Sequence, residues 1–377
     1  MSALSRVQLD EIHVVSGPLA SHRWLHFGAY QLELVIPLQT VEALWPALDH
    51  AIDGCAWTLV TSEGGAKRWS ALPQPPDCQL HPATTLIAGR AAAIRLSDIT
   101  GPLVAFGGGT VIDFAKVVAC EIADLADGAA FPSIIAIPTV VGSGSERTPF
   151  ASVWTLAGKH SVEHPQLRPA AVILIPALAT SVPRDLAAIS ALDALSHALE
   201  AIWNRNASPT SDRFAAAALP VLADGLDRLA NAKGAIDLET VGRLMTGASL
   251  AGEAIALTRT ALAHSISYPL TTELRVPHGL ASAFALAEIA RFNQGADARF
   301  DVIAHALECD RLDVPDRIER LLRRAGVGAL LALPGRTALE TIATPMTGSV
   351  RAANNIRAVA EGQARAIALA AAETLSC

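Results

Sequence analysis

The sequence predicts an α/β N-terminal domain, built on a parallel, Rossmann-like sheet, and an all-α helical C-terminal domain. Over residues 57–176, apolar runs alternate with helical patterns, as a parallel sheet requires. Two of these runs end in glycine-rich turns. From Pro183 onward the strand pattern disappears and segments rich in Ala and Leu follow. Because a chain of 377 residues is expected to form about two domains, we place them at residues 1–183 and 184–377.

Residues 1–55 are harder to place than the rest of the chain. Residues 40–52 have the spacing of an amphipathic helix, and we expect a hairpin at the edge of a sheet before them. A cluster of prolines predicts a loop between the first two strands of the α/β region: Pro73, Pro75, Pro76 and Pro82.

Composition narrows the class of protein. The formal net charge is −7 and no basic run occurs, which argues against nucleic-acid binding. The five cysteines are scattered without CxxC spacing, which is typical of the reducing cytoplasm rather than of a disulfide framework. No run reaches the roughly 18 apolar residues of a membrane span, and the N-terminus lacks the apolar core of a signal peptide. We therefore expect a cytoplasmic protein with no membrane partner.

The first glycine-rich turn predicts a phosphate-binding site. The apolar run at residues 103–106 indicates a buried strand, three glycines follow, and Thr110 is a candidate N-cap for the next helix. This geometry presents backbone N–H groups and a helix dipole to a phosphate. The alternative is a tight strand–helix turn without a ligand, since the spacing matches neither GxGxxG nor a Walker A loop.

A second strand runs into a loop rich in Gly and Ser at residues 134–146. Two such junctions in one α/β region predict two loops that line one crevice at the carboxyl ends of the strands.

One carboxylate and three imidazoles form a candidate metal site. Asp193 and His197 are four residues apart in a predicted helix, so they share one face. His264 follows an apolar stretch, and His278 follows Pro277 at the start of a predicted helix. Three nitrogens and one oxygen suit Fe(II), Zn(II) or Co(II) better than Mg(II) or Ca(II). The alternative is a surface Asp–His pair and an unrelated loop His.

Four motifs, in this order, resemble the iron-dependent (group III) alcohol dehydrogenase family, which shares its fold with dehydroquinate synthase. They are GGGTVIDFAK at residues 107–116, PTVVGSGSE at 138–146, DALSHALE at 193–200, and HSISYPL with VPHG within 264–279. The resemblance implies a dinucleotide-binding N-terminal domain, an all-helical C-terminal domain, and a metal in the cleft between them. It also suggests a homodimer.

The resemblance assigns residues to roles. It implies that the metal, Fe2+ or Zn2+, is held by Asp193, His197, His264 and His278. It implies that NADPH or NADH contacts the two glycine-rich loops and neighbouring positions: Ser62, Gly107, Gly108, Gly109, Thr110, Asp113, Thr139, Ser143 and Lys159.

Two departures from the family pattern bear on the mechanism. Tyr268 stands where many members have a His that is often considered a proton relay, so we assign it as the candidate catalytic proton donor; the alternative is a packed aromatic. Ser62 stands where NAD-preferring members often carry an Asp that would repel a 2′-phosphate. With Lys67 and Arg68 nearby, this favours NADPH, unless the two cations belong to a solvated helix face.

Several stretches are similar to one branch of the family, the phosphonoacetaldehyde reductases of phosphonate metabolism. They lie at residues 148–154, 159–161, 203–209 and 259–271. A dianionic phosphonate needs cationic groups in its pocket. Arg147 and Arg259 are candidate anion-binding residues because the family places their segments near the cleft; the alternative for each is a surface charge.

We therefore expect a metal-dependent, NAD(P)H-linked reductase that converts an aldehyde to a primary alcohol, most specifically phosphonoacetaldehyde to 2-hydroxyethylphosphonate. In that mechanism the metal polarises the carbonyl as a Lewis acid and hydride passes to the carbonyl carbon. A general short-chain alcohol dehydrogenase and, less favoured, a cyclase of the dehydroquinate synthase type are the alternatives. A non-catalytic nucleotide- or metal-binding protein is a third.

Overall fold

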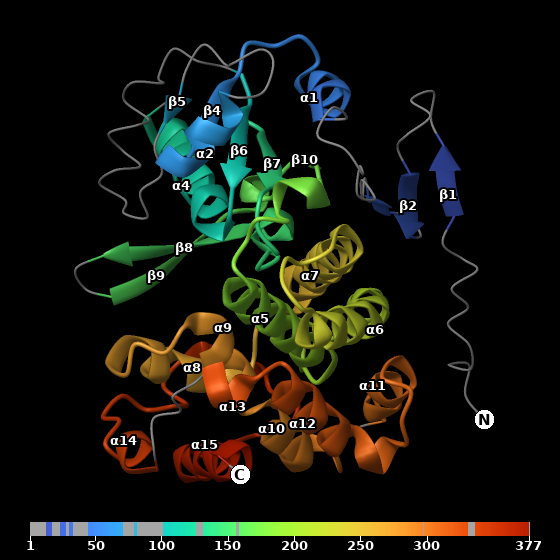
Figure 1. Cartoon of the computed structure of the whole chain (residues 1–377). Helices are drawn as coiled ribbons and strands as arrows, with labels where there is room; N and C mark the ends of the chain where they lie inside the picture. The colour runs from blue at the N-terminus through green and yellow to red at the C-terminus, as the bar shows by residue number, and fades with distance from the viewer. Residues whose placement is uncertain are drawn as a thin grey trace.

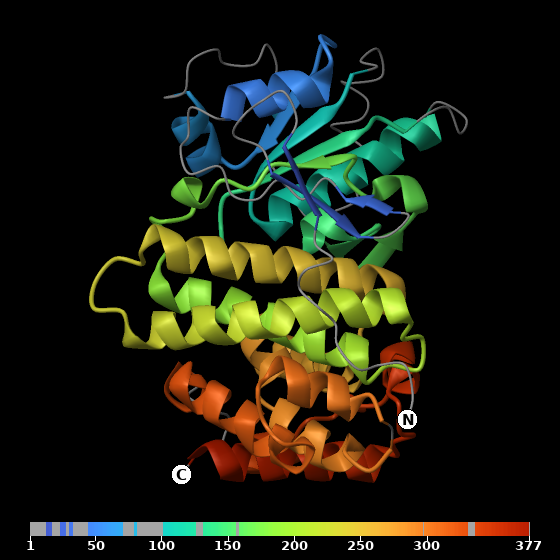
Figure 2. The same cartoon turned by 90° about the vertical axis from the view of Figure 1, so that its right-hand side faces the viewer.

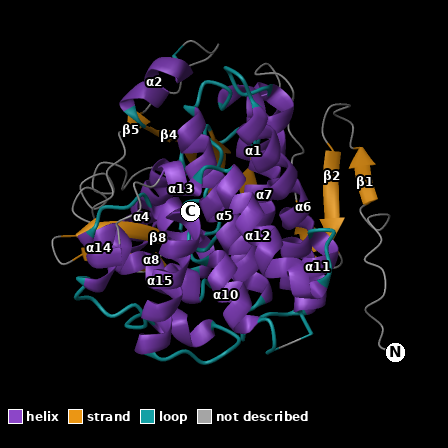
Figure 3. Cartoon of the chain, turned by 60° about the horizontal axis from the view of Figure 1, so that its bottom comes forward, coloured by secondary structure: helices purple, strands orange, loops and turns teal. Residues whose placement is uncertain are grey.

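The computed structural model describes residues 13–16, 23–27, 30–32, 44–70, 79–80, 101–125, 131–155, 158–296, 298–330 and 336–376. Figures 1 and 2 show an α/β layer at one end and, across the middle, three long helices: α5 (Arg184–Ile202), α6 (Pro209–Asn231) and α7 (Leu238–Thr258). Later helices form the other end, and Figure 3 shows that most of the described chain is helical. None of the helices in these ranges is long and apolar enough to cross a membrane. The predicted fold class is confirmed.

Five parallel strands form the sheet of the α/β layer in the order β10-β7-β6-β4-β5. Their bounds are β4 (Thr58–Thr61), β5 (Gln79–Leu80), β6 (Leu103–Gly107), β7 (Ile134–Pro138) and β10 (Ala171–Val172). Val104 of the central strand β6 pairs with Leu59 of β4 and with Ile135 of β7. Strands buried on both faces are apolar along their whole length, which explains the continuous runs in the sequence.

Alternate residues of β6 face two different helix layers, because successive side chains of a strand point to opposite faces. Leu103 and Ala105 pack with α4 (Gly109–Leu125). Val104 and Phe106 pack with α1 (Leu44–Ile52) and α2 (Glu63–Trp69) on the other face. The turn from β6 into α4 is therefore supported from both sides.

Two antiparallel sheets lie outside the main sheet. The expected N-terminal hairpin is present, but its strands β1 (His13–Ser16) and β2 (Arg23–Phe27) join β3 (Tyr30–Leu32) and not an edge of the five-stranded sheet. The other is the hairpin of β8 (Phe150–Thr155) and β9 (Gly158–Glu163). Residues 40–43 of the predicted helix, and the four prolines of the predicted loop, lie outside the described residues. Between those prolines, Gln79 and Leu80 form strand β5 of the sheet and not a loop, because they pair with β4.

The helical part follows the 3-10 turn η5 (Pro176–Leu178). After α7 come α8 (Leu262–Glu273), α9 (His278–Ala283), α10 (Leu286–Asn293), α11 (Phe300–Ala306), η6 (Arg311–Asp313), α12 (Val314–Arg324), α13 (Val327–Leu330), α14 (Arg336–Glu340), η7 (Val350–Asn354) and α15 (Glu361–Ser376). Helix α5 packs against α6, α7 and α9, and all of its residues from 191 to 202 are buried. A helix covered on all sides need not be amphipathic. The predicted domain boundary at residue 183 stays a prediction.

Two glycines bring the α/β layer into direct contact with α7. Gly144, just before η3 (Ser145–Arg147), has a φ of +79°, which favours glycine. A Cβ atom on Gly252 of α7 would lie 2.6 Å from the backbone oxygen of Gly144. The backbone of the second glycine-rich loop therefore rests on α7 with no space for a side chain between them.

Candidate metal and cofactor site

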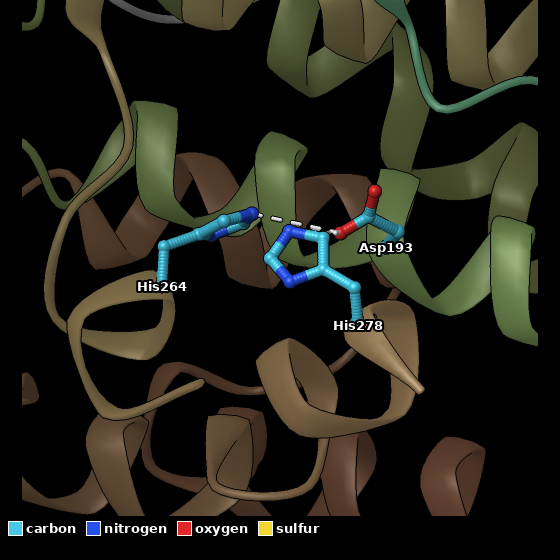
Figure 4. A group of neighbouring side chains, drawn as sticks. All are labelled: Asp193, His264 and His278. Carbon is cyan, nitrogen blue, oxygen red and sulfur yellow. Dashed lines mark ion pairs between the residues drawn. The ribbon is translucent and has the colours of Figure 1, made fainter. Parts of the chain in front are cut away.

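Three helices bring the four predicted metal ligands together. Asp193 comes from α5, His264 from α8 and His278 from the first residue of α9, and each offers a ligand atom within 4.8 Å of the others (Figure 4). The Asp193 Oδ1 atom lies 3.5 Å from Nε2 of His264 and 3.9 Å from Nε2 of His278. The His278 side chain is 36% exposed, so the group is open to solvent on that side.

His197 joins this group from the next turn of α5. Its Nε2 atom lies 3.1 Å from Nε2 of His264 and 3.9 Å from Oδ1 of Asp193. Imidazole nitrogens that face one another beside a carboxylate form a donor set of borderline softness, which suits Fe2+ or Zn2+. The residues present fit the implied metal, and the assignment of all four as ligands remains our proposal.

Asp193 is held in its ionised form. Burial raises the pKa of this carboxyl group, but His197, His278 and His264 outweigh burial and hold the pKa below its ordinary value. Ser282 Oγ donates a hydrogen bond of 3.0 Å to Asp193 Oδ1. Both effects keep a charged oxygen available to a cation.

Glu200 supports His264 from behind, and sequence reasoning missed this role. Its side chain is fully buried, and its Oε2 atom lies 2.6 Å from Nδ1 of His264. Its Oε1 atom accepts hydrogen bonds from the backbone N–H groups of Ala263 and His264. Because Nδ1–H donates to this carboxylate, the Nε2 lone pair of His264 faces the metal group. The available signal was spacing: Asp193, His197 and Glu200 occur at i, i+4 and i+7 of one helix.

The two glycine-rich loops lie side by side at the carboxyl ends of β6 and β7, as predicted. The backbone N–H of Thr139 donates to the Gly107 oxygen over 3.1 Å. A Cβ atom on Gly109 would lie 2.7 Å from Ser143 Oγ, and one on Gly108 would lie 3.1 Å from Val140.

The N-cap prediction for Thr110 is wrong. Helix α4 begins at Gly109, and the backbone N–H of Val111 donates to the oxygen of Gly108. Thr110 is therefore an exposed residue of the first helical turn. The glycines start the helix earlier because their backbones can enter the turn without a Cβ clash.

Asp113 and Lys116 of α4 hold the second loop. Asp113 accepts hydrogen bonds from Ser145 Oγ and from the backbone N–H of Ser152. The Lys116 ammonium donates to the backbone oxygens of Ser145 and Phe150, and burial lowers its pKa to about 8. Asp113 thus fixes the second glycine-rich loop through hydrogen bonds within the protein. Its predicted contact with the cofactor stays a prediction.

Two other predicted cofactor positions, Ser62 and Thr139, form hydrogen bonds within the protein. Ser62 is the N-cap of α2 and accepts a hydrogen bond from Gly65 N. Arg68 donates to Thr139 Oγ1 over 3.0 Å and to the Leu178 backbone oxygen. Lys159 lies in β9, but its side chain is outside the described part of the structure.

The cations near Ser62 do not settle the cofactor's identity. Lys67 pairs with Glu63 in solvent over 3.4 Å, as on a solvated helix face. The preference for NADPH over NADH therefore stays a prediction.

Arg147 does not fit its predicted anion-binding role. It is the last residue of η3 and is buried against α7, where Nε donates to Ser249 Oγ over 2.7 Å and Nη1 lies 3.6 Å from Glu253 Oε1. Arg168 pairs with the same carboxylate. The guanidinium of Arg147 therefore binds side chains of α7. Glu253 is within reach because the neighbouring Gly252 lets α7 pack directly against the backbone of Gly144.

Arg259 lies between α7 and α8 and is already paired. It follows α7 with a φ of +68°, and its guanidinium forms an ion pair with Glu163 and lies over the Phe150 ring. Tyr268 lies one turn after His264 on α8, so it shares a helix face with a predicted ligand.

Comparisons with known proteins agree with this arrangement. The family described as Fe-containing alcohol dehydrogenase, C-terminal, matches residues 187–370, and the family described as iron-containing alcohol dehydrogenase matches residues 76–176. A phosphonoacetaldehyde reductase of Streptomyces viridochromogenes is 34% identical over 276 residues, which cover 67% of this chain and 64%, just under two thirds, of that protein. The probable alcohol dehydrogenase EutG of Escherichia coli is 31% identical, and the match covers 68% of each chain.

Solved structures share the fold. The sulfoacetaldehyde reductase of Bifidobacterium kashiwanohense, in complex with NAD+, has a TM-score of 0.75 at 23% identity, over 89% of this chain and 95% of the other. An iron-containing alcohol dehydrogenase of Corynebacterium glutamicum has the same TM-score and identity, over 88% of this chain and 92% of the other. With the family matches spanning both the glycine-rich loops and the His-rich helices, the chain belongs to the iron-containing alcohol dehydrogenase family.

Proposed function

We propose that this chain reduces an aldehyde to a primary alcohol with NAD(P)H and a divalent metal, and that its preferred substrate is phosphonoacetaldehyde. The observation that carries the activity is the convergence of Asp193, His197, His264 and His278, with Glu200 behind His264. The family uses a divalent metal and a nicotinamide cofactor, which supports the same reading of the site.

The protein's own residues prepare the site for this reaction. Asp193 supplies a charged oxygen, and Glu200 fixes the His264 tautomer whose Nε2 lone pair faces inward. When bound there, a divalent metal would polarise the carbonyl oxygen as a Lewis acid, while reduced nicotinamide would supply the hydride. Tyr268, one turn from His264, is our candidate for the proton delivered to the product oxygen.

The glycine-rich loops are our candidate for binding the cofactor diphosphate. Helix α4 begins at Gly109, the last of the three glycines, so the backbone N–H groups at its N-terminus can approach a phosphate closely. Ser143 and Thr139 of the second loop lie against this turn. Arg68 donates a hydrogen bond to the Thr139 hydroxyl.

The phosphonate substrate is supported by one relative. The phosphonoacetaldehyde reductase of Streptomyces viridochromogenes is 34% identical over 67% of this chain. A general short-chain alcohol dehydrogenase is the second candidate, because EutG and the 1-propanol dehydrogenase PduQ of Salmonella typhimurium are each 31% identical. An anion-binding cation in the substrate pocket distinguishes the two chemistries.

Steady-state kinetics of the metal-loaded full chain test the proposal. We would compare kcat/KM for phosphonoacetaldehyde and propionaldehyde, with NADH and NADPH in turn. A preference for phosphonoacetaldehyde is expected, and a clear preference for propionaldehyde would overturn the substrate assignment. Absence of net nicotinamide oxidation with every aldehyde would overturn the reductase, since a cyclase recycles its cofactor.

A further inference from the structure

Hydrogen bonds join the 3-10 turn η7 and its flanking residues to the start of α8, the helix that carries the predicted metal ligand His264. Ser265, which follows His264, donates to the Met346 backbone oxygen over 2.6 Å and lies 2.9 Å from the hydroxyl of Ser349. At the other end, Asn354 Nδ2 donates to the Thr260 backbone oxygen over 2.9 Å. Residues 350–353 are therefore held between two anchor points on the segment that carries His264.

Arg351 is the second residue of η7 and is partly buried. Its charge interacts with those of Glu200, Tyr268 and Arg259, and its turn is bonded to Ser265, the residue after His264. Within the described part of the chain, no carboxylate lies within ion-pairing distance of Arg351 and no hydrogen bond of its guanidinium is present. The nearest named carboxylate, Glu200, is fully buried and already accepts from His264 and its backbone.

A partly buried guanidinium without a counter-ion is costly, because burial disfavours the charged form. Burial lowers the pKa of Arg351, and Arg259 lowers it further, while Glu200 and Tyr268 act in the opposite direction. A metal at Asp193 would add more positive charge nearby. An anion beside Arg351 would relieve this repulsion.

Three arginines are candidate anion-binding residues: Arg147, Arg259 and Arg351. Among them, Arg351 has a guanidinium that can still bind an anion. Arg147 is bound to Ser249 and Glu253, and Arg259 is paired with Glu163. Arg351 also belongs to a turn that four side-chain and backbone hydrogen bonds keep in place, so its backbone position is fixed.

We propose that Arg351 binds the anionic group of the substrate, a phosphonate dianion, and so selects an anionic aldehyde over an uncharged one. This inference rests on the proposed function, because it places the aldehyde carbon at the metal group and the anion on the side of η7 and Tyr268. The planar guanidinium can donate two parallel hydrogen bonds to phosphonate oxygens, which an ammonium cannot. Arg351 is thereby a specificity-determining residue that replaces Arg147 and Arg259 in that role.

Kinetics with a charged and an uncharged substrate test this assignment. For Arg351→Gln we expect kcat/KM for phosphonoacetaldehyde to fall at least about 30-fold, mainly through KM, while kcat/KM for propionaldehyde changes less than about threefold. Arg351→Lys should recover part of the loss, since it keeps the charge but not the planar fork. The matched control is Arg357→Gln, which removes a cation that is bound to Phe292 at the same loop.

A binding experiment gives a second readout that needs no turnover. Ethylphosphonate, which has no carbonyl, is titrated calorimetrically into the metal-loaded wild type and the Arg351→Gln and Arg357→Gln variants. Binding should be lost only in Arg351→Gln. Equal losses for both aldehydes, or unchanged ethylphosphonate binding by Arg351→Gln, would overturn the role of Arg351 while leaving the reductase proposal intact. If the wild type reduces no aldehyde, the proposed function fails instead.

Discussion

Replacing Glu200 by Gln tests the metal site most directly, because the change keeps the side-chain shape and removes only charge and an acceptor. In the structure, one Glu200 oxygen faces Nδ1 of His264 at 2.6 Å and the other faces two backbone N–H groups. A Gln amide cannot satisfy both sides. Either its NH2 group faces the backbone donors, or it faces Nδ1 and moves the ring proton to Nε2, where the ring can no longer bind a metal.

The size of the effect follows from this conflict. Removing a charge-assisted hydrogen bond and leaving a buried donor unpaired costs about 1.5–3 kcal/mol. A support of this kind behind a metal-binding His is typically worth about 10–100-fold in metal affinity, which is the same range. We therefore expect Glu200→Gln to weaken metal binding about 10–100-fold, with a parallel loss of activity at limiting metal.

Metal content after dialysis against graded chelator measures this affinity. Glu273→Gln is the matched control, because Glu273 lies on α8, the helix of His264, and also accepts two backbone N–H bonds, but from Ala343 and Thr344. The control should keep wild-type metal affinity. If Glu200→Gln folds normally and its metal affinity stays within about twofold of wild type, the support role assigned to Glu200 is refuted.

Four further predictions follow from the same structure. Asp193→Ala should remove metal and activity together, and tight stoichiometric metal in the purified variant would contradict its assignment as a ligand. Tyr268→Phe should lower kcat at least about tenfold, while a fall of less than about twofold would rule it out as the proton donor. Gly252→Ala should lower the free energy of unfolding by about 1–3 kcal/mol and raise KM for the cofactor, because the new Cβ would lie 2.6 Å from the backbone oxygen of Gly144; unchanged chemical denaturation would contradict this contact. Burial raises the pKa of Glu361, but the hydrogen bonds it accepts outweigh burial and hold the pKa below its ordinary value of 4.5. The ionised carboxylate therefore stabilises the fold above about pH 4.5, and this contribution is lost as the pH falls through the folded-state pKa. The stability difference between wild type and Glu361→Gln should accordingly shrink on acidification, and a difference that grows at low pH would show the sign to be wrong.

Much of the fold could be predicted because its signals are local. The runs at β6 and β7 are apolar throughout, as strands covered on both faces must be, and glycines follow both strands. The predictions that failed concern features that depend on contacts with other segments or on neighbouring residues. The N-terminal hairpin has the alternation of a strand pair, but only packing decides which sheet it joins. Thr110 has N-cap chemistry, yet the flexible glycines before it let the helix start at Gly109.

The candidate site divides in the same way. Asp193 and His197 could be paired from sequence, because four residues make about one helical turn. The separation of 67 residues between His197 and His264 carries no such geometry, so their grouping depended on ligand type and on the resemblance to a family. Arg147 was misplaced because a charge near a glycine-rich loop is equally compatible with a pocket and with a buried ion pair.

The sequence by itself determined the chemistry available to this protein: one carboxylate and three imidazoles in family order, two glycine-rich turns and a parallel sheet. Periodicity and residue type are sufficient for these, since each depends on neighbours within a few residues. The tertiary structure decided which groups meet. It placed Glu200 next to His264, paired Arg147 with Glu253, and left Arg351 near the site with no counter-ion among the residues that the structure describes. Contacts between distant segments depend on how helices dock, and that docking follows from the shape of the whole core rather than from any short stretch of sequence.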